Sequence, residues 1–298
     1  MQYHKSVLLK ESIDALEVSN GGVYVDTTFG GGGHSREILS RVQNCSLYSF
    51  DQDEDALENE LDDERLTLIH SNFSELENSL KLYRVDKVDG VLADLGVSSH
   101  QFDSEQRGFS IRFDGPLDMR MGKEIQKTAS DIICEYSWEE LSEMLRSYSD
   151  LKGTGRIARR IKEVSELSPL RSTSELVEVL KKMAPANKHN KFLAQVFQAF
   201  RIEVNDEMQV LKDMLNQTID VLKPGGKLVV ISYHSIEDRL VKNFMRSGSF
   251  NGEEEKDFFG NSLSPFNMIT RKPIVPSSSE IDENNRARSA KLRVAKKV

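Results

Sequence analysis

The sequence is poor in cysteine, proline and tryptophan. Among 298 residues there are two cysteines, seven prolines and one tryptophan. Cys45 and Cys134 are too few for a disulfide framework, and they lack the spacing of a metal-ligand cluster. The chain is therefore not a small scaffold held together by disulfides, and we expect both cysteines to be buried thiols.

Long apolar runs are also absent. No stretch approaches the ~20 residues that a transmembrane helix needs, and the amino-terminal residues Met-Gln-Tyr-His-Lys-Ser lead into an amphipathic segment, not into the apolar centre of a signal peptide. Hydrophobic residues make up 38% of the chain and charged residues 30%, enough to bury a core and stay in solution. We predict a cytoplasmic protein without a membrane partner.

The net charge of −8 is unevenly distributed. Residues 151–201 hold 11 Lys and Arg against 4 Asp and Glu, and residues 286–298 hold 6 basic residues and no acid. These zones carry +7 and +6, so the rest of the chain carries −21. Two basic zones on an acidic protein could contact a phosphate backbone. The alternative is that the lysines and arginines only solvate helices.

Four consecutive glycines, 30–33, stand between an apolar strand at 23–26 and a helix that places Ile38, Leu39 and Val42 on one side. Such a loop lets a ligand approach main-chain N–H groups at a helix start. A phosphate-binding loop would need lysine where His34 stands, and the nicotinamide fingerprint would need glycine in place of Ser35. The remaining pattern, Asp26-x-x-x-Gly-x-Gly, is typical of S-adenosylmethionine sites. A flexible linker is the alternative, but the flanking strand and helix argue against it.

Further strands are predicted at 46–51, 66–71, 88–96 and 227–234, with helices between the early ones. This alternation indicates a parallel α/β sheet that binds ligands beyond its carboxyl ends. Asp51 ends one strand 21 residues after Gly30, the spacing at which a carboxylate reaches ribose hydroxyls, although such an acid can also cap a helix. Asp94 ends the strand that starts at Val88, and we expect its carboxylate near the glycine loop.

About a hundred residues separate the fourth and fifth strands, too many for a structureless loop. Helices are predicted at 138–148, 157–164, 174–183 and 192–200, followed by one at 203–222 and a Pro-Gly-Gly turn at 224–226. Beyond the fifth strand we predict a helix at 236–245, a mobile segment at 247–264, a hairpin formed by 266–270 and 290–295, and a polar linker at 277–285. A first helix is predicted at 5–18.

Together these residues resemble the bacterial small-subunit ribosomal RNA methyltransferase family that methylates N4 of a cytosine. The motifs that carry the resemblance follow the family order and span nearly the whole chain: Thr28-Phe-Gly-x-Gly-Gly-His-Ser35, Asp94-Leu-Gly-Val-Ser-Ser99, Arg107-Gly-Phe-Ser110, Gly115-Pro-Leu-Asp-Met-Arg-Met121, Gln198-Ala-x-Arg-Ile-x-Val-Asn205, His234-Ser-x-Glu-Asp-Arg239 and Asn285-Arg-Ala-Arg-Ser289. Three positions depart from the family pattern: Gly31 where a basic residue is frequent, His100 in place of proline, and Tyr233 in place of phenylalanine.

The resemblance implies a class I S-adenosylmethionine-dependent methyltransferase (Rossmann-like) sheet at 1–104 and 203–298, and an inserted helical substrate-recognition domain at 105–202. The donor contacts that it implies are Gly32, Gly33, His34, Asp51, Phe73, Asp94 and Gln101. We assign Asp94 and His234 as candidate catalytic residues. Phe73 could instead be core packing, His234 a satisfied histidine at a strand end, and Asp94 a turn former. Residues 116–121 could be either a structural staple between domains or a substrate contact.

The predicted activity is methylation of the N4 amine of a specific cytidine in 16S ribosomal RNA, with S-adenosylmethionine as donor and no metal. The expected partner is small-subunit ribosomal RNA within a ribosomal particle, and the sequence leaves a homodimer open. One alternative is a donor-binding assembly factor without turnover. Another is a methyltransferase for a small molecule or protein, whose helical insert is only a lid; the basic insert and tail argue against it.

Overall fold

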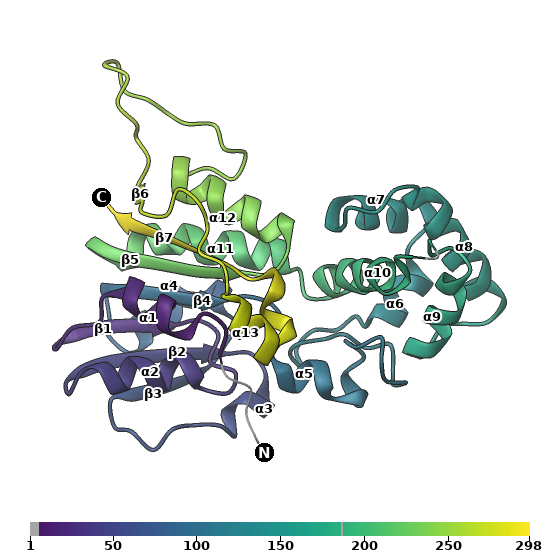
Figure 1. Cartoon of the computed structure of the whole chain (residues 1–298), viewed down its shortest axis with the longest axis horizontal. Coiled ribbons are helices and arrows are strands. Elements are labelled where there is room, and N and C mark those ends of the chain that lie inside the picture. The colour runs from purple at the N-terminus through teal and green to yellow at the C-terminus, as the bar shows by residue number, and fades with distance from the viewer. Residues whose placement is uncertain (1–5, 186) are drawn as a thin grey trace. The chain divides into compact units, whose positions relative to one another are not determined.

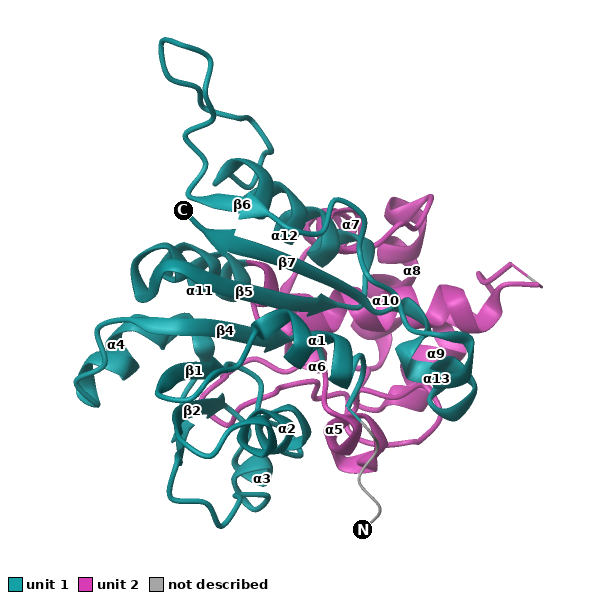
Figure 2. Cartoon of the chain, turned by 60° about the vertical axis from the view of Figure 1, so that its left-hand side comes forward, with its two compact units in different colours: residues 1–96, 209–298 teal, residues 97–208 magenta. Residues whose placement is uncertain are grey.

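The computed structural model describes residues 6–185 and 187–298, so residue 5 of the predicted first helix lies outside the description. The chain forms two compact units, residues 1–96 with 209–298 and residues 97–208 (Figure 2). We call them the sheet unit and the helical unit and describe each by itself. No helix in the described part of the chain is long and apolar enough to cross a membrane.

The sheet unit is built on seven strands (Figure 1). Their order across the sheet is β3-β2-β1-β4-β5-β7-β6. The strands β1 to β5 pair in parallel, whereas β7 pairs antiparallel with both β5 and β6. This is the class I methyltransferase sheet, and it confirms the predicted fold class. The strand bounds are β1 Gly22–Asp26, β2 Cys45–Asp51, β3 Leu66–His70, β4 Val88–Asp94, β5 Leu222–Ser232, β6 Phe266–Met268 and β7 Lys291–Lys297.

Helices cover both faces of the sheet because its central strands are apolar on both sides. In β5, Leu228 and Val230 pack with α4, α11 and α12, while Val229 and Ile231 pack with α1 and α2. Successive residues of a strand point to opposite faces, so one apolar run serves two cores. The helices of this unit are α1 Leu9–Leu16, α2 Gly33–Arg41, α3 Glu54–Leu57, α4 Leu76–Leu82, α11 Glu207–Val221, α12 Ser235–Ser247 and α13 Ser278–Glu283, with short 3₁₀ turns η1 Phe73–Glu75 and η3 Asn285–Ser289.

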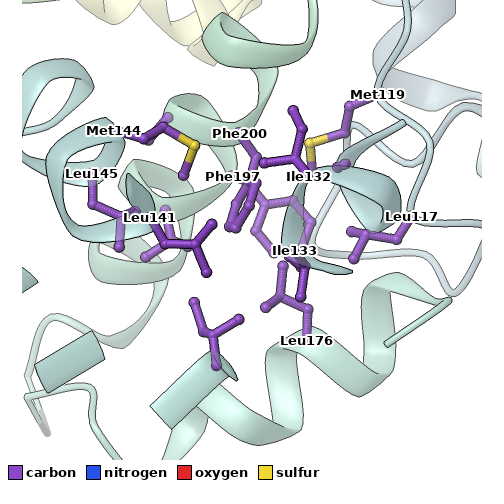
Figure 3. Close-up of a cluster of buried hydrophobic side chains, with 14 of the residues drawn as sticks. Leu117, Met119, Ile132, Ile133, Leu141, Met144, Leu145, Leu176, Phe197 and Phe200 are labelled. Carbon is purple, nitrogen blue, oxygen red and sulfur yellow. The ribbon is translucent and has the colours of Figure 1, made fainter. Parts of the chain in front are cut away.

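The helical unit has its own apolar core, in which Phe197 and Phe200 of α10 contact side chains from the surrounding helices (Figure 3). Four of its described helices begin at capping boxes: Ser98 precedes α5, Thr128 precedes α6, Ser137 precedes α7 and Ser172 precedes α9. A side-chain oxygen there binds an N–H that the helix leaves unpaired. The helices are α5 Ser99–Asp103, η2 Glu105–Arg107, α6 Ala129–Glu135, α7 Trp138–Tyr148, α8 Thr154–Leu167, α9 Thr173–Lys181 and α10 His189–Val204.

The segment 115–121 is fastened inside the helical unit. The Asn205 side chain accepts the N–H of Met121 at 2.7 Å and donates to the carbonyl of Met119 at 2.8 Å. Asp118 and Arg120 form a two-point ion pair within the segment. Met119 has φ of 65°, a conformation that non-glycine residues keep only where the surroundings impose it. These contacts fix the segment within this unit, and its role as a staple between domains or as a substrate contact remains a prediction.

Several predicted elements were wrong in detail. The helix predicted at 203–222 is two helices, because α10 ends at Val204 and α11 begins at Glu207, with Asp206 between them at φ 46°. The predicted Pro-Gly-Gly turn is an irregularity inside β5, where the pairing with β4 shifts register. The polar linker at 277–285 contains α13, and α6 was missed. Cys45 is buried as expected, but Cys134 is exposed.

Candidate active site

Three acids stand at one edge of the sheet. Asp26, Asp51 and Asp94 are the last residues of β1, β2 and β4. Because these strands are parallel neighbours, their carboxyl ends meet at the same edge. The glycine loop begins at Gly30, shortly after Asp26, so the loop and the acids form one site within the sheet unit.

The glycine loop is held by hydrogen bonds at its first residue. The N–H of Gly30 donates to Oδ2 of Asp51 at 2.8 Å, and its carbonyl accepts the side-chain amide of Asn59 at 3.0 Å. Gly32 has φ of 71° and precedes the first residue of α2. A Cβ on Gly33 would lie 2.0 Å from Oγ of Ser6. The first N–H groups of α2 have no carbonyl partner within the helix, which makes them available to a ligand.

Asp51 has a second role that the spacing did not predict. Besides Gly30, its carboxylate accepts the N–H of Asp53 at 2.9 Å, so it orders both the glycine loop and the turn after β2. Burial raises the pKa of Asp51 to about 6, while these two backbone hydrogen bonds act in the opposite direction. Its contact with ribose remains a prediction.

Asp26 is fully buried and ties α2 to the sheet. Its Oδ2 accepts the hydroxyl of Ser35 at 2.7 Å, and Oδ1 accepts the N–H of Thr28 at 3.1 Å. The oxygen of Ser35 also lies 2.8 Å from that of Ser49 in β2. Ser35 is the residue that breaks the nicotinamide fingerprint, and this network gives it a structural reason.

Asp94 is held on three sides. Its N–H donates to Oγ1 of Thr28 at 2.7 Å, its Oδ1 accepts the hydroxyl of Tyr233 at 2.7 Å, and its Oδ2 lies 3.8 Å from Nδ1 of His34. The side chain remains 21% exposed. The carboxylate is thus fixed in orientation and still open to a ligand.

The electrostatics of Asp94 follow from this setting. Burial raises its pKa to about 6, whereas His34 and the hydrogen bond from Tyr233 lower it. The negative charges of Asp26 and Glu237 add to the rise. At neutral pH the group is therefore ionised, yet it holds a proton better than an ordinary aspartate.

His34 is buried in the first turn of α2. Its Nε2 lies 3.2 Å from the carbonyl of Val7. A carbonyl can only accept, so Nε2 carries a proton, and Nδ1 faces Asp94, whose pKa His34 lowers when its ring is protonated. Sequence reasoning found His34 and Asp94 but missed Tyr233 as their neighbour. The signal was present, because Tyr233 is one of the three departures from the family pattern.

His234 caps a helix. Its Nδ1 accepts the N–H of Glu237 at 3.3 Å at the start of α12. Its Nε2 lies 3.0 Å from Oε1 of Glu237, without the geometry of a hydrogen bond. The side chain is buried. Nδ1 is thus satisfied as a helix cap, whereas the buried Nε2 has no hydrogen-bond partner among the described residues. Both the satisfied histidine and the catalytic role therefore remain predictions for His234.

The two other predicted donor contacts have structural roles of their own. Phe73 begins the 3₁₀ turn after β3 and is half-buried against the sheet core. Gln101 belongs to the helical unit, where it is buried and its Oε1 accepts the N–H of Ser98 in a capping box at 3.0 Å. Contact of either residue with a donor molecule remains a prediction.

The strand order, the glycine loop after β1 and the acids at the strand ends define a class I methyltransferase. A family model described as the MraW methylase family matches residues 1–298. The chain belongs to this family.

Individual relatives agree with this assignment. A Ribosomal RNA small subunit methyltransferase H of Christiangramia forsetii is 54% identical over 299 residues, which cover 100% of this chain and 99% of the relative. The protein of the same name from Flavobacterium johnsoniae is 53% identical over 299 residues, with the same coverage. Among solved structures, an rRNA methylase from Streptococcus thermophilus aligns over 98% of both chains at 12% identity, with a TM-score of 0.44.

Proposed function

We propose that this chain transfers the methyl group of S-adenosylmethionine to the N4 amine of one cytidine in 16S ribosomal RNA. The proposal rests on the family, on the names of its relatives, and on the chemistry of the strand-end site. We further propose that the substrate is the RNA within a small-subunit ribosomal particle in the bacterial cytoplasm. The proposal does not depend on whether the protein forms a homodimer.

The residues at the sheet edge suit the donor chemically. The carboxylate of Asp51 can accept hydroxyl groups of a ribose, and the first N–H groups of α2 can bind the carboxylate of a methionine portion. S-adenosylmethionine supplies a methyl carbon that its sulfonium charge makes electrophilic. Asp26 and Asp94 place negative charge at the edge where that cation would lie, which favours its binding.

The carboxylate of Asp94 can activate the N4 amine that receives the methyl group. Cytosine N4 is a weak nucleophile because its lone pair is delocalised into the ring. A carboxylate that accepts an N–H of this amine favours the pyramidal form, whose lone pair can attack. Oδ1 of Asp94 is already bound to Tyr233, so Oδ2 is the oxygen available to the amine.

Methyl transfer to N4 also requires the nitrogen to lose a proton. A bond forms between N4 and the methyl carbon while the carbon–sulfur bond breaks, and its electron pair stays on sulfur. The nitrogen gains positive charge and must lose one N–H proton. Asp94, with a pKa of about 6, can take that proton and release it to water at neutral pH. The sheet edge thereby positions both reactants and accepts the single proton released.

RNA binding is assigned to α8 in the helical unit. Arg156, Arg159 and Arg160 are exposed, whereas Ile157, Ala158 and Ile161 of the same helix are buried in the core. Arg159 lies over the ring of Trp138 at 3.9 Å, an arrangement that steadies a cation without neutralising it.

The basic tail supports the proposal less than its composition suggests. Arg293 is buried and donates to Asp238 at 2.6 Å, and Lys291 donates to the same carboxylate at 3.1 Å. Two of the six basic residues of the tail therefore neutralise an acid inside the sheet unit. We assign phosphate binding to α8 and not to β7.

The single observation that carries the proposal is the fixed Asp94 carboxylate beside the glycine loop. The test is a transfer assay with a labelled methyl donor and small ribosomal subunits that lack the modification, followed by nucleoside digestion. We expect label in N4-methylcytidine, and a much slower reaction with Asp94→Asn. Binding of donor and particle without any transfer would favour the assembly factor, and label in a protein would favour the third alternative.

A further inference from the structure

Two phenylalanines stand almost fully in solvent on one segment of the sheet unit. Phe258 is 98% exposed and Phe259 is 85% exposed. They belong to residues 249–264, between α12 and β6, which we call the acidic arm. In both views the arm extends away from the sheet to which it is attached (Figures 1 and 2). Fully exposed aromatic pairs are uncommon on a protein surface unless they bind something.

The tip of the arm holds the two rings in a defined arrangement. Oδ1 of Asp257 accepts the N–H groups of Phe259 and Asn261, each at 2.8 Å, and the N–H of Asp257 donates to the carbonyl of Asn261 at 2.9 Å. The rings of Phe258 and Phe259 meet edge to face with centroids 5.7 Å apart. The pair is therefore organised before it meets a partner, which lowers the entropy cost of binding.

The base of the arm is attached to the core. The Phe250 ring stacks on Phe244 of α12 with centroids 5.2 Å apart, and the side chain of Asn243 donates to the carbonyl of Phe250 at 3.0 Å. Gly248, which ends α12 at φ 73°, packs against Pro265, since an added Cβ would come within 2.5 Å of the proline ring. The base of the arm is thus fixed to the sheet unit.

The charge of the arm indicates the kind of partner. Residues 249–264 contain Glu253, Glu254, Glu255 and Asp257 against one basic residue, Lys256, a balance of −3. Negative charge next to the rings opposes docking on a phosphate backbone and on the anionic inner surface of a membrane. It favours a protein surface whose apolar pocket is bordered by lysine or arginine.

We propose that the acidic arm is a docking element that inserts Phe258 and Phe259 into an apolar pocket on a basic protein of the small ribosomal subunit. The proposal rests on the proposed function only for the choice of particle. It adds to the RNA contacts of α8 a second contact that naked RNA cannot provide. The chain should therefore methylate the particle with a lower KM than the same RNA without its proteins.

The first test replaces both rings. The variant Phe258→Ser with Phe259→Ser should raise KM for small subunits on the order of 10- to 100-fold, as loss of central aromatic anchors does, and leave KM for naked RNA and the affinity for S-adenosylmethionine unchanged. Leu82→Ser is the matched control, because Leu82 is 84% exposed in the same unit but outside the arm. An unchanged KM for subunits in the double variant overturns the docking role. If the unaltered chain methylates neither substrate, the proposed function fails instead.

The second test identifies the partner. Replacing Phe258 by the photocrosslinker p-benzoylphenylalanine should give, on irradiation with small subunits, an adduct with a ribosomal protein that survives ribonuclease. Crosslinks to RNA, to a second copy of this chain, or at no higher yield than from position 82 overturn the proposal. Reversing the charges by Glu253→Lys, Glu254→Lys and Glu255→Lys should raise KM for subunits, whereas a fall in KM would indicate an RNA partner and refute a basic protein.

Discussion

Removing one hydroxyl group from Tyr233 should shift the pH at which the enzyme works. Tyr233→Phe keeps the ring but deletes the donor that lies 2.7 Å from Oδ1 of Asp94. That hydrogen bond favours the ionised form of the carboxyl, and the proposed chemistry needs Asp94 ionised. Without it the pKa of Asp94 rises, so a higher pH is needed for the same rate.

The size of the shift can be worked out from the site. A hydrogen bond to a charged group contributes about 1.5–3 kcal/mol, which corresponds to roughly one to two units of pKa. Starting from a pKa of about 6, the variant should titrate at roughly 7 to 8. At pH 7 its single-turnover rate should then be about two- to ten-fold lower, and near pH 9 it should recover.

The assay is the single-turnover rate of methyl transfer from pH 5.5 to 9 at saturating donor. The unaltered enzyme should gain activity as the pH rises through about 6. Asp94→Asn is the matched control, since its residual rate should show no such transition. A profile of Tyr233→Phe with the same midpoint as the unaltered enzyme would refute the role of this hydroxyl. A uniform loss at all pH values would indicate a structural role only.

Four further predictions concern Asp94, Asp51 and the arginines of α8. Asp94→Asn should slow single-turnover transfer on the order of 10- to 100-fold. Folding raises the pKa of Asp94, so between about pH 4 and 6 the native state binds a proton that the unfolded state does not, and the protein loses stability as the pH rises through this window. Asp94→Asn removes this loss and should raise the unfolding free energy by up to roughly 3 kcal/mol at pH 7.5. A thermal midpoint of the variant that is not higher at this pH would contradict the prediction. Asp51→Ala should weaken donor binding about 10- to 150-fold in calorimetry, and binding to the unaltered protein should weaken as the pH falls through about 6; equal affinities would remove Asp51 from the site. Replacing Arg156, Arg159 and Arg160 by glutamine should flatten the log–log dependence of RNA affinity on salt by roughly 0.7–0.9 per lost phosphate contact and leave donor binding unchanged, and an unaltered slope would leave these residues as solvated helix charges.

The sheet could be predicted from the sequence because its strands are short apolar runs bounded by glycines and acids. A strand such as β4 is buried on both faces, and this burial leaves a plain signal in the residues. Asp26, Asp51 and Asp94 could be placed together for the same reason, since parallel strands share one carboxyl edge. Of the helices that begin at capping boxes, α7 and α9 were predicted near their true starts, whereas α6 was missed.

The contacts that define the site could not be predicted. The Tyr233–Asp94 hydrogen bond joins residues 139 positions apart, and no periodicity encodes such a pair. The same holds for Arg293, which looked like a surface charge of the tail and is buried against Asp238.

The break between α10 and α11 and the helix α13 were not predicted for a different reason. Asp206 adopts a positive φ between α10 and α11, although the apolar spacing continues across it. A pattern of apolar residues reports which face is buried but not whether the helix is continuous. The helix α13 was missed because its polar sequence has no buried face to reveal it.

The central claim is that the fixed Asp94 carboxylate serves methyl transfer to a cytidine N4 in 16S ribosomal RNA. Its most direct test is mass spectrometry of 16S nucleosides and fragments from cells that lack the gene, complemented with the unaltered chain or with Asp94→Asn. The account predicts N4-methylation at one cytidine with the unaltered chain, and strongly reduced methylation with the variant at equal protein level. Full methylation by the variant, or an rRNA whose modification does not depend on the chain, would contradict it.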